Sequence, residues 1–105
     1  MKTCELICNK ESGKGKNIKM ENLIKKIESY GYKVNMFYTE KPGDAKEHVR
    51  TMDKVNLVLS IGGDGTFNEI VSGNYLREEK LVLSHIPTGT TNDLGHMLEI
   101  GRAHV

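Results

Sequence analysis

Hydrophobic residues occur along this chain with two different spacings. Short apolar runs predict buried β-strands at residues 5–8, 33–38, 55–61 and 81–86. Between the strands, apolar residues three and four positions apart predict amphipathic helices, and the clearest of these runs from Met20 to Ile27. Strands that alternate with helices pair in parallel through right-handed crossovers. The pattern therefore predicts an α/β fold built on a parallel sheet.

Glycine and polar residues mark the expected ends of the helices. Gly31 ends the first helix as a C-cap. Asp44 follows a Pro-Gly break and is positioned to cap the second helix. The last helix is expected over residues 92–98. The third helix is expected to carry the apolar residues Phe67, Ile70, Val71 and Tyr75.

Three glycines surround one aspartate directly after the third strand, in the segment SIGGDGTFNE at residues 60–69. Glycine reaches positive φ, which lets successive N–H groups point toward an anion. Thr66 and Glu69 have the spacing of a capping box, so we expect the helix to begin at Thr66. Its N-terminus carries free N–H groups that suit phosphate. The alternative is an ordinary strand-to-helix turn that binds no ligand.

A second polar turn follows the fourth strand, in the segment PTGTTND at residues 87–93. Its threonine, asparagine and aspartate side chains supply hydrogen-bond donors and acceptors. Ligands of open α/β sheets bind at the carboxyl ends of the strands, so one ligand would meet both turns. The alternative is a loop whose polar side chains cap the following helix.

The two turns resemble motifs of the diacylglycerol kinase catalytic family, which includes bacterial lipid kinases and sphingosine kinases. Residues 62–69 match G-G-D-G-T-x-N-E, and residues 87–93 match P-x-G-T-x-N-D. The segment at residues 9–13 resembles N-P-x-S/A-G, with Lys10 in place of the usual proline, and Thr39 begins a T-E pair. Thr91 and Leu94 stand where the family often has glycine and phenylalanine, and neither change removes a phosphate donor.

The resemblance implies a three-layer parallel-sheet nucleotide-binding lobe of the NAD kinase and diacylglycerol kinase type over residues 1–98. The whole enzyme would use ATP and Mg²⁺ to transfer the γ-phosphoryl group to a lipid hydroxyl, such as that of diacylglycerol, at a membrane surface. The family's C-terminal β-rich lobe supplies the catalytic base and the magnesium-associated acidic residues. That lobe is not found here, so we assign no catalytic residue and no metal ligand, and we expect this chain alone to be inactive.

By the same resemblance, the ATP-binding residues are expected to be Asn9, Lys10, Glu11, Ser12, Gly13, Thr39, Gly63, Asp64, Gly65, Thr66, Phe67, Asn68, Glu69 and Thr90. The glycine turn would hold phosphate or its magnesium, and Asn68 and Glu69 would brace that turn. Thr39 would line the adenosine side, and Thr90 would close the site. A bare carboxylate repels phosphate, so Asp64 is given a metal-linked or turn-bracing role.

Two other functions remain open at this point. NAD kinases share a G-G-D-G turn and a similar lobe, although residues 68–69 and 87–93 favour a lipid kinase. Phosphorylation of NAD but of no lipid by the full-length protein would favour the NAD kinase. The other alternative is a non-enzymatic α/β module, which the absence of saturable ATP binding in magnesium would favour.

Composition excludes several classes of protein. The net charge is +1, which gives no general case for nucleic-acid binding. The apolar runs are much shorter than the roughly 20 residues of a membrane span, and no signal-peptide core opens the chain, so we expect a cytoplasmic protein. Basic residues such as Lys19, Lys25 and Lys26 could attract an anionic membrane surface peripherally, although a solvated helix face is the more common explanation of such residues.

The spacing of the cysteine and histidine residues predicts neither a disulfide nor a metal site. Cys4 and Cys8 lie about 13 Å apart along one strand, which is too far for a disulfide. The four histidines show no metal-ligand spacing and are taken as non-functional; they are His48, His85, His96 and His104.

Residues 99–105 are expected to be a non-native tail. The segment IGRAHV breaks the preceding helical pattern and can be encoded by a sequence that resembles a common short-read sequencing adapter. Such segments are excluded from fold reasoning. A genuine polar C-terminus is the alternative, and sequencing the DNA past codon 99 distinguishes the two.

Overall fold

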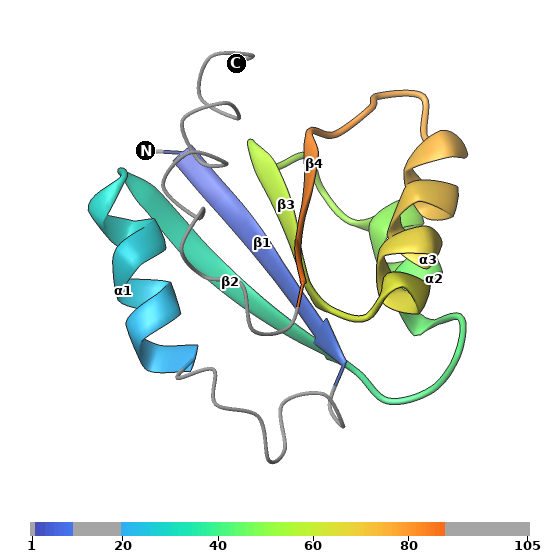
Figure 1. Ribbon diagram of the computed structural model, residues 1–105. Helices are drawn as coiled ribbons and strands as arrows, with labels where there is room; N and C mark the ends of the chain where they lie inside the picture. Colours follow the sequence, from blue (N-terminus) through green and yellow to red (C-terminus); the bar gives the residue numbers. More distant parts are fainter. Residues whose placement is uncertain (1, 10–19, 88–105) are drawn as a thin grey trace.

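The computed structural model describes residues 2–9 and 20–87, which form a parallel sheet with helices on both faces (Figure 1). The strands are β1 (Lys2–Asn9), β2 (Tyr32–Thr39), β3 (Leu57–Gly62) and β4 (Leu83–Pro87). The helices are α1 (Met20–Ser29), α2 (Asp44–Thr51) and α3 (Asp64–Tyr75). The strand order is β2-β1-β3-β4, and all the neighbouring strands are parallel. The predicted α/β fold class is confirmed.

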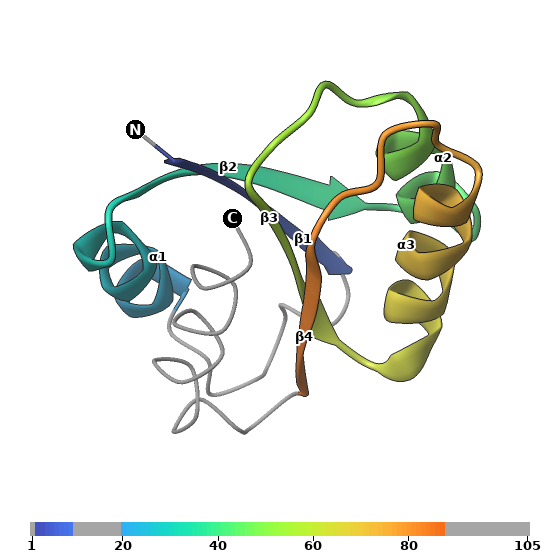
Figure 2. The ribbon, with the colours of Figure 1, turned by 90° about the horizontal axis from the view of Figure 1, so that it is seen from above.

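Helix α1 covers one face of the sheet, while α2 and α3 cover the other (Figure 2). Two hydrophobic clusters fill the spaces between these layers. Leu23 and Ile27 of α1 pack with Leu6 and Leu59 of the sheet. On the opposite face, Ala45 and Val49 of α2 and Ile70 of α3 pack with Ile7 and Val58. Both faces of β3 are therefore enclosed and all six of its residues are buried, as its continuous apolar run predicts.

One carboxylate interrupts the apolar face of β1 beneath α2. Glu5 is 7% exposed, and its Oε2 lies 2.5 Å from Nε2 of His48. The His48 ring stacks on Phe37 with the ring centroids 3.7 Å apart. Because a buried carboxylate is costly without a partner, His48 has a structural role beneath the sheet.

The two predicted side-chain caps are wrong. Gly43 is the N-cap of α2 with φ 93°, and Gly63 is the N-cap of α3, which begins at Asp64 rather than at Thr66. Neither helix has a side-chain capping bond. Asp44 instead accepts the backbone N–H groups of the preceding turn, and Glu69 reaches across to the N–H of Gly43. In both cases the carboxylate accepts hydrogen bonds from the turn between β2 and α2, whereas the local sequence pattern predicts a bond to the end of its own helix.

The buried face of α3 also differs from the expected one. Val71 and Tyr75 are 43% and 79% exposed, whereas Ile70 and Gly73 are buried. A Cβ built on Gly73 would overlap the backbone oxygen of Lys46. The helix therefore turns its glycine toward α2, because only a residue without a side chain fits this close approach.

Arg77 holds the C-terminal end of α2. One of its guanidinium nitrogens donates to the carbonyl of Val49 at 2.8 Å and to that of Met52 at 2.7 Å. These contacts satisfy carbonyl groups at a helix end and place positive charge there.

Replacement of this guanidinium with an apolar side chain is expected to lower stability. Arg77→Met should reduce the free energy of unfolding by about 1–2 kcal/mol, because charge-assisted hydrogen bonds to the α2 carbonyls are lost. Urea denaturation measures the change. Arg50→Met is the matched control, since Arg50 is exposed and pairs with Glu47 three residues earlier, and such pairs contribute little. Equal losses in the two variants would contradict the role of Arg77.

No helix in the described part of the chain is both long and apolar enough to cross a membrane.

Candidate functional site

A hollow of about 430 Å³ opens at the carboxyl edge of the sheet. The turns after β2 and β3 lie at this edge, beside the end of β1 (Figure 1). The connections from β1 and from β3 leave on opposite faces, which is where open α/β sheets bind ligands. The hollow is lined by Asn9, Thr39, Glu40, Lys41, Pro42, Gly63, Gly65, Thr66 and Glu69.

Two polar residues come from the ends of adjacent strands. Asn9 ends β1 and is paired in register with Thr39, which ends β2. Thr39 is 5% exposed, so its position is fixed by the surrounding protein. The parallel register places these two residues side by side at the hollow, although 30 positions separate them in the sequence.

The first turn of α3 forms another part of the lining. Gly63, Gly65 and Thr66 line it, and the first N–H groups of a helix have no partner within the helix. The partial positive charge of such an N-terminus favours an anion. The turn uses positive φ at Gly62, where φ is 123°, whereas Gly63 has φ −81° and Gly65 lies inside α3. Within this turn, positive φ is therefore confined to Gly62, and a Cβ at Gly65 would meet nothing within 4 Å.

The turn between β2 and α2 completes the hollow with Glu40, Lys41 and Pro42, which sequence reasoning did not assign to the site. Asp44 Oδ2 accepts the N–H groups of Glu40 at 2.9 Å and Lys41 at 3.0 Å. These bonds lower the pKa of Asp44, because backbone donors stabilise its charged form. The position of this turn directly after a parallel strand is the signal that could have identified its residues.

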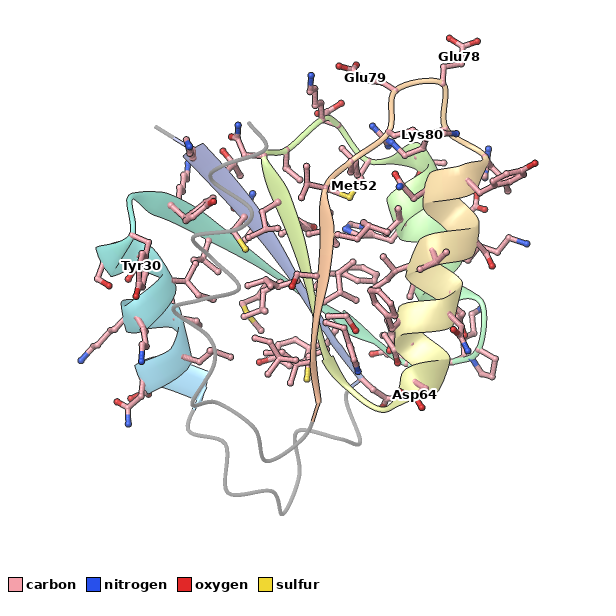
Figure 3. All side chains as sticks on the ribbon, turned by 45° about the horizontal axis from the view of Figure 1, so that its top comes forward. Tyr30, Met52, Asp64, Glu78, Glu79 and Lys80 are labelled. Carbon is pink, nitrogen blue, oxygen red and sulfur yellow. The ribbon has the colours of Figure 1, made fainter. Side chains whose placement is uncertain are left out.

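Three of the predicted ATP-binding residues in the glycine motif lie outside the lining of the hollow. The side chain of Asp64 is 96% exposed at the start of α3 (Figure 3). Phe67 packs on His85 with the ring centroids 4.9 Å apart, and Asn68 is exposed. Lys10, Glu11, Ser12, Gly13 and Thr90 lie outside the described residues, as do the predicted last helix and the segment at residues 99–105.

A histidine from β4 approaches Asp64. The Nδ1 of His85 lies 3.2 Å from Oγ of the fully buried Ser60, and its Nε2 lies 3.8 Å from Oδ1 of Asp64. With Phe67 against one face, the ring is held by three neighbours. This arrangement places His85, which the sequence pattern left without a role, next to the glycine motif.

Residues 2–9 and 20–87 contain neither a cluster of metal ligands nor a reactive thiol. No group of three or more histidine, cysteine, aspartate or glutamate side chains there is arranged to hold a metal ion. Cys4 and Cys8 are free and buried. Burial, followed by the charge of Glu5, raises the pKa of Cys4 to about 12, so this thiol is no nucleophile near neutral pH.

The fold and the hollow define an α/β protein with a candidate ligand site at the carboxyl edge of its sheet. The chain belongs to the diacylglycerol kinase catalytic domain family, whose model matches residues 3–105. This match confirms the resemblance found in the motifs.

Relatives of known name agree with this assignment. A diacylglycerol kinase of Staphylococcus aureus (strain bovine RF122 / ET3-1) is 37% identical over 102 residues, covering 94% of this chain and 32% of that protein. One from Staphylococcus epidermidis (strain ATCC 12228 / FDA PCI 1200) is 39% identical over 103 residues, with the same coverage. A crystal structure of a diacylglycerol kinase from Bacillus anthracis str. Sterne matches with a TM-score of 0.66 and 28% identity, covering 94% of this chain and 37% of that one. The chain thus spans about a third of the length of these relatives.

Proposed function

We propose that this chain is the ATP-binding lobe of a lipid kinase, which transfers the γ-phosphoryl group of ATP to a lipid hydroxyl such as that of diacylglycerol. The observation that carries the proposal is the hollow at the carboxyl edge. It gathers residues from three of the four motifs, namely Asn9, Thr39, Gly63, Gly65, Thr66 and Glu69. The names of the relatives support the lipid acceptor over NAD, the acceptor of the alternative kinase.

We expect the nucleotide to use two parts of the lining with different chemistry. The first turn of α3 suits the phosphates, because its N–H groups and the Thr66 hydroxyl can donate hydrogen bonds to them. The partial positive charge of the helix N-terminus also attracts these anions. Asn9 and Thr39 suit the adenosine side, because their side chains offer uncharged donors and acceptors. Phosphoryl transfer depends mainly on positioning and on charge stabilisation, which a lobe of this kind supplies.

Magnesium is part of the proposal, and the carboxylate of Asp64 is available to it. Mg²⁺ usually keeps several waters and binds one or two carboxylates together with substrate phosphates. Asp64 is exposed beside the turn that would hold the phosphates, and it makes no capping bond. Of its two expected roles we therefore propose the metal-linked one. The ion would neutralise the charge of the phosphates, and the chain would contribute the Asp64 carboxylate and the helix N–H groups.

An obstruction of the hollow tests the site. Gly65→Val is expected to weaken ATP binding at least tenfold, because the added isopropyl group would enter the space that the phosphates need. Folding should change far less, since a Cβ at this position meets nothing within 4 Å. Calorimetric titration with ATP and magnesium measures the affinity, and urea denaturation measures the stability.

The matched control is Ser72→Val, which adds a β-branched residue to an exposed position of the same helix, outside the hollow. This variant should bind ATP as the parent does. Equal affinity of the parent and Gly65→Val would show that the turn is only structural. Absence of saturable binding by the parent would instead favour a non-enzymatic module.

A further inference from the structure

Among the described residues that line the hollow, Lys41 is the one with a cationic side chain. None of the sequence motifs includes it. We propose that Lys41 binds the phosphate groups of the nucleotide together with the first turn of α3. This assignment rests on the proposed function, because it adds a residue to the same nucleotide site.

The turn that carries Lys41 is anchored at three backbone positions. Asp44 Oδ2 accepts the N–H groups of Glu40 and of Lys41 itself. Glu69 Oε1, which comes from α3, accepts the N–H of Gly43 at 3.0 Å. The turn after β2 is therefore tied both to α2 and to α3, which also lines the hollow. A backbone fixed in this way lowers the cost of ordering a ligand-binding side chain.

The charges around the hollow also favour this role. A helix N-terminus offers only about half of an elementary charge, whereas a nucleotide triphosphate carries several negative charges. The lining also contains carboxylate side chains, so a cation at the hollow would favour the binding of an anion there. Lys41 supplies a full positive charge, and an ammonium group binds phosphate as a point charge.

Lys41 is available for a ligand in the part of the chain that the structure describes. Its side chain is exposed and forms no ion pair with the described residues. Lys54, by contrast, pairs with Glu79 at 2.6 Å on the opposite edge of the sheet. Lys41 therefore lines a hollow of nucleotide size without a protein partner from residues 2–9 and 20–87 to compete with phosphate.

Binding of a phosphate series by the 105-residue chain tests the assignment. Calorimetry with ATP, ADP, AMP and adenosine, at low and at high potassium chloride, compares the parent with Lys41→Ala, Lys41→Arg and Lys46→Ala. Lys46 is an exposed lysine of α2 that does not line the hollow, so its variant controls for the loss of one charge. A thermal melt of each variant confirms that it is folded.

Lys41→Ala is expected to weaken ATP binding about tenfold and to reduce its dependence on salt, because a charged contact is screened by ions. Adenosine binding should stay within twofold, Lys41→Arg should recover most of the ATP affinity, and Lys46→Ala should match the parent. If Lys41→Ala binds ATP as Lys46→Ala does, or loses adenosine binding equally, the assignment of Lys41 is overturned while the nucleotide site stands. If the parent binds none of the four ligands, the nucleotide site itself is wrong and the assignment falls with it.

Discussion

Gly73→Ala is expected to lower the free energy of unfolding by about 1–3 kcal/mol, the usual cost of overpacking a tight contact. The added methyl group would overlap the carbonyl oxygen of Lys46 and lie 3.2 Å from its carbonyl carbon and 3.3 Å from the backbone nitrogen of Arg50. These atoms belong to the backbone of α2, so no rotation of a side chain relieves the contact. Helices α2 and α3 would have to separate, which would loosen the hydrophobic cluster beneath them.

The sign of the change in the free energy of unfolding shows whether packing or helix propensity dominates at Gly73. Alanine is favoured over glycine inside a helix by about 1 kcal/mol, so propensity alone predicts stabilisation. Gly65→Ala is the matched control in the same helix, because a Cβ there meets nothing within 4 Å. Urea denaturation should show a loss for Gly73→Ala and no loss for Gly65→Ala. Stabilisation by both substitutions would mean that α2 and α3 pack less closely than the structure shows.

The layered fold could be predicted because hydrophobic spacing reports how each element is buried. The apolar run at residues 55–61 corresponds to β3, which is enclosed on both faces. The spacing of Leu23 and Ile27 corresponds to the single face that α1 buries on the sheet. Both patterns arise from contacts along a whole element. They therefore remain recognisable when a predicted end of the element is wrong by one or two residues.

The helix ends and the orientation of α3 could not be predicted from local patterns. Asp44 and Glu69 have the sequence positions of capping residues, but both bond to the turn between β2 and α2. Gly73 counts as neutral in a hydrophobic pattern, yet its contact with α2 decides which face of α3 is buried. These features depend on how the elements approach one another, which a single sequence does not specify.

Some residues of the candidate site could likewise be predicted from the sequence, and others could not. Asn9, Thr39 and the glycine turn could be predicted because each belongs to a motif and each follows a strand of a parallel sheet. Lys41 and Pro42 were left out because no motif includes them, although they lie on the same edge. The contact between His85 and Asp64 could not be predicted without knowing that β4 pairs with β3. This pairing makes Ser60 and His85 register partners, although 25 positions separate them in the sequence.

Asp64→Asn in the proposed full-length lipid kinase is expected to lower the rate of phosphoryl transfer at least tenfold, which corresponds to about 1.4 kcal/mol of transition-state stabilisation. The proposed role of the carboxylate is to hold magnesium against the phosphates, and an amide lacks the charge for it. The stability of the protein should change little, because the side chain is 96% exposed and its contact with His85 is 3.8 Å long. Transfer of radiolabelled phosphate to diacylglycerol in mixed micelles measures the rate.

Asp53→Asn provides the matched control for this experiment. Asp53 is exposed in the connection from α2 to β3, which lies at the amino edge of the sheet, away from the hollow. The same chemical change there should leave the rate near that of the parent, so a loss confined to Asp64→Asn assigns the effect to the phosphate turn. A folded Asp64→Asn enzyme with near-normal turnover would refute the metal-linked role. The carboxylate would then contribute only negative charge to the first turn of α3, where it stabilises a helix without taking part in the reaction.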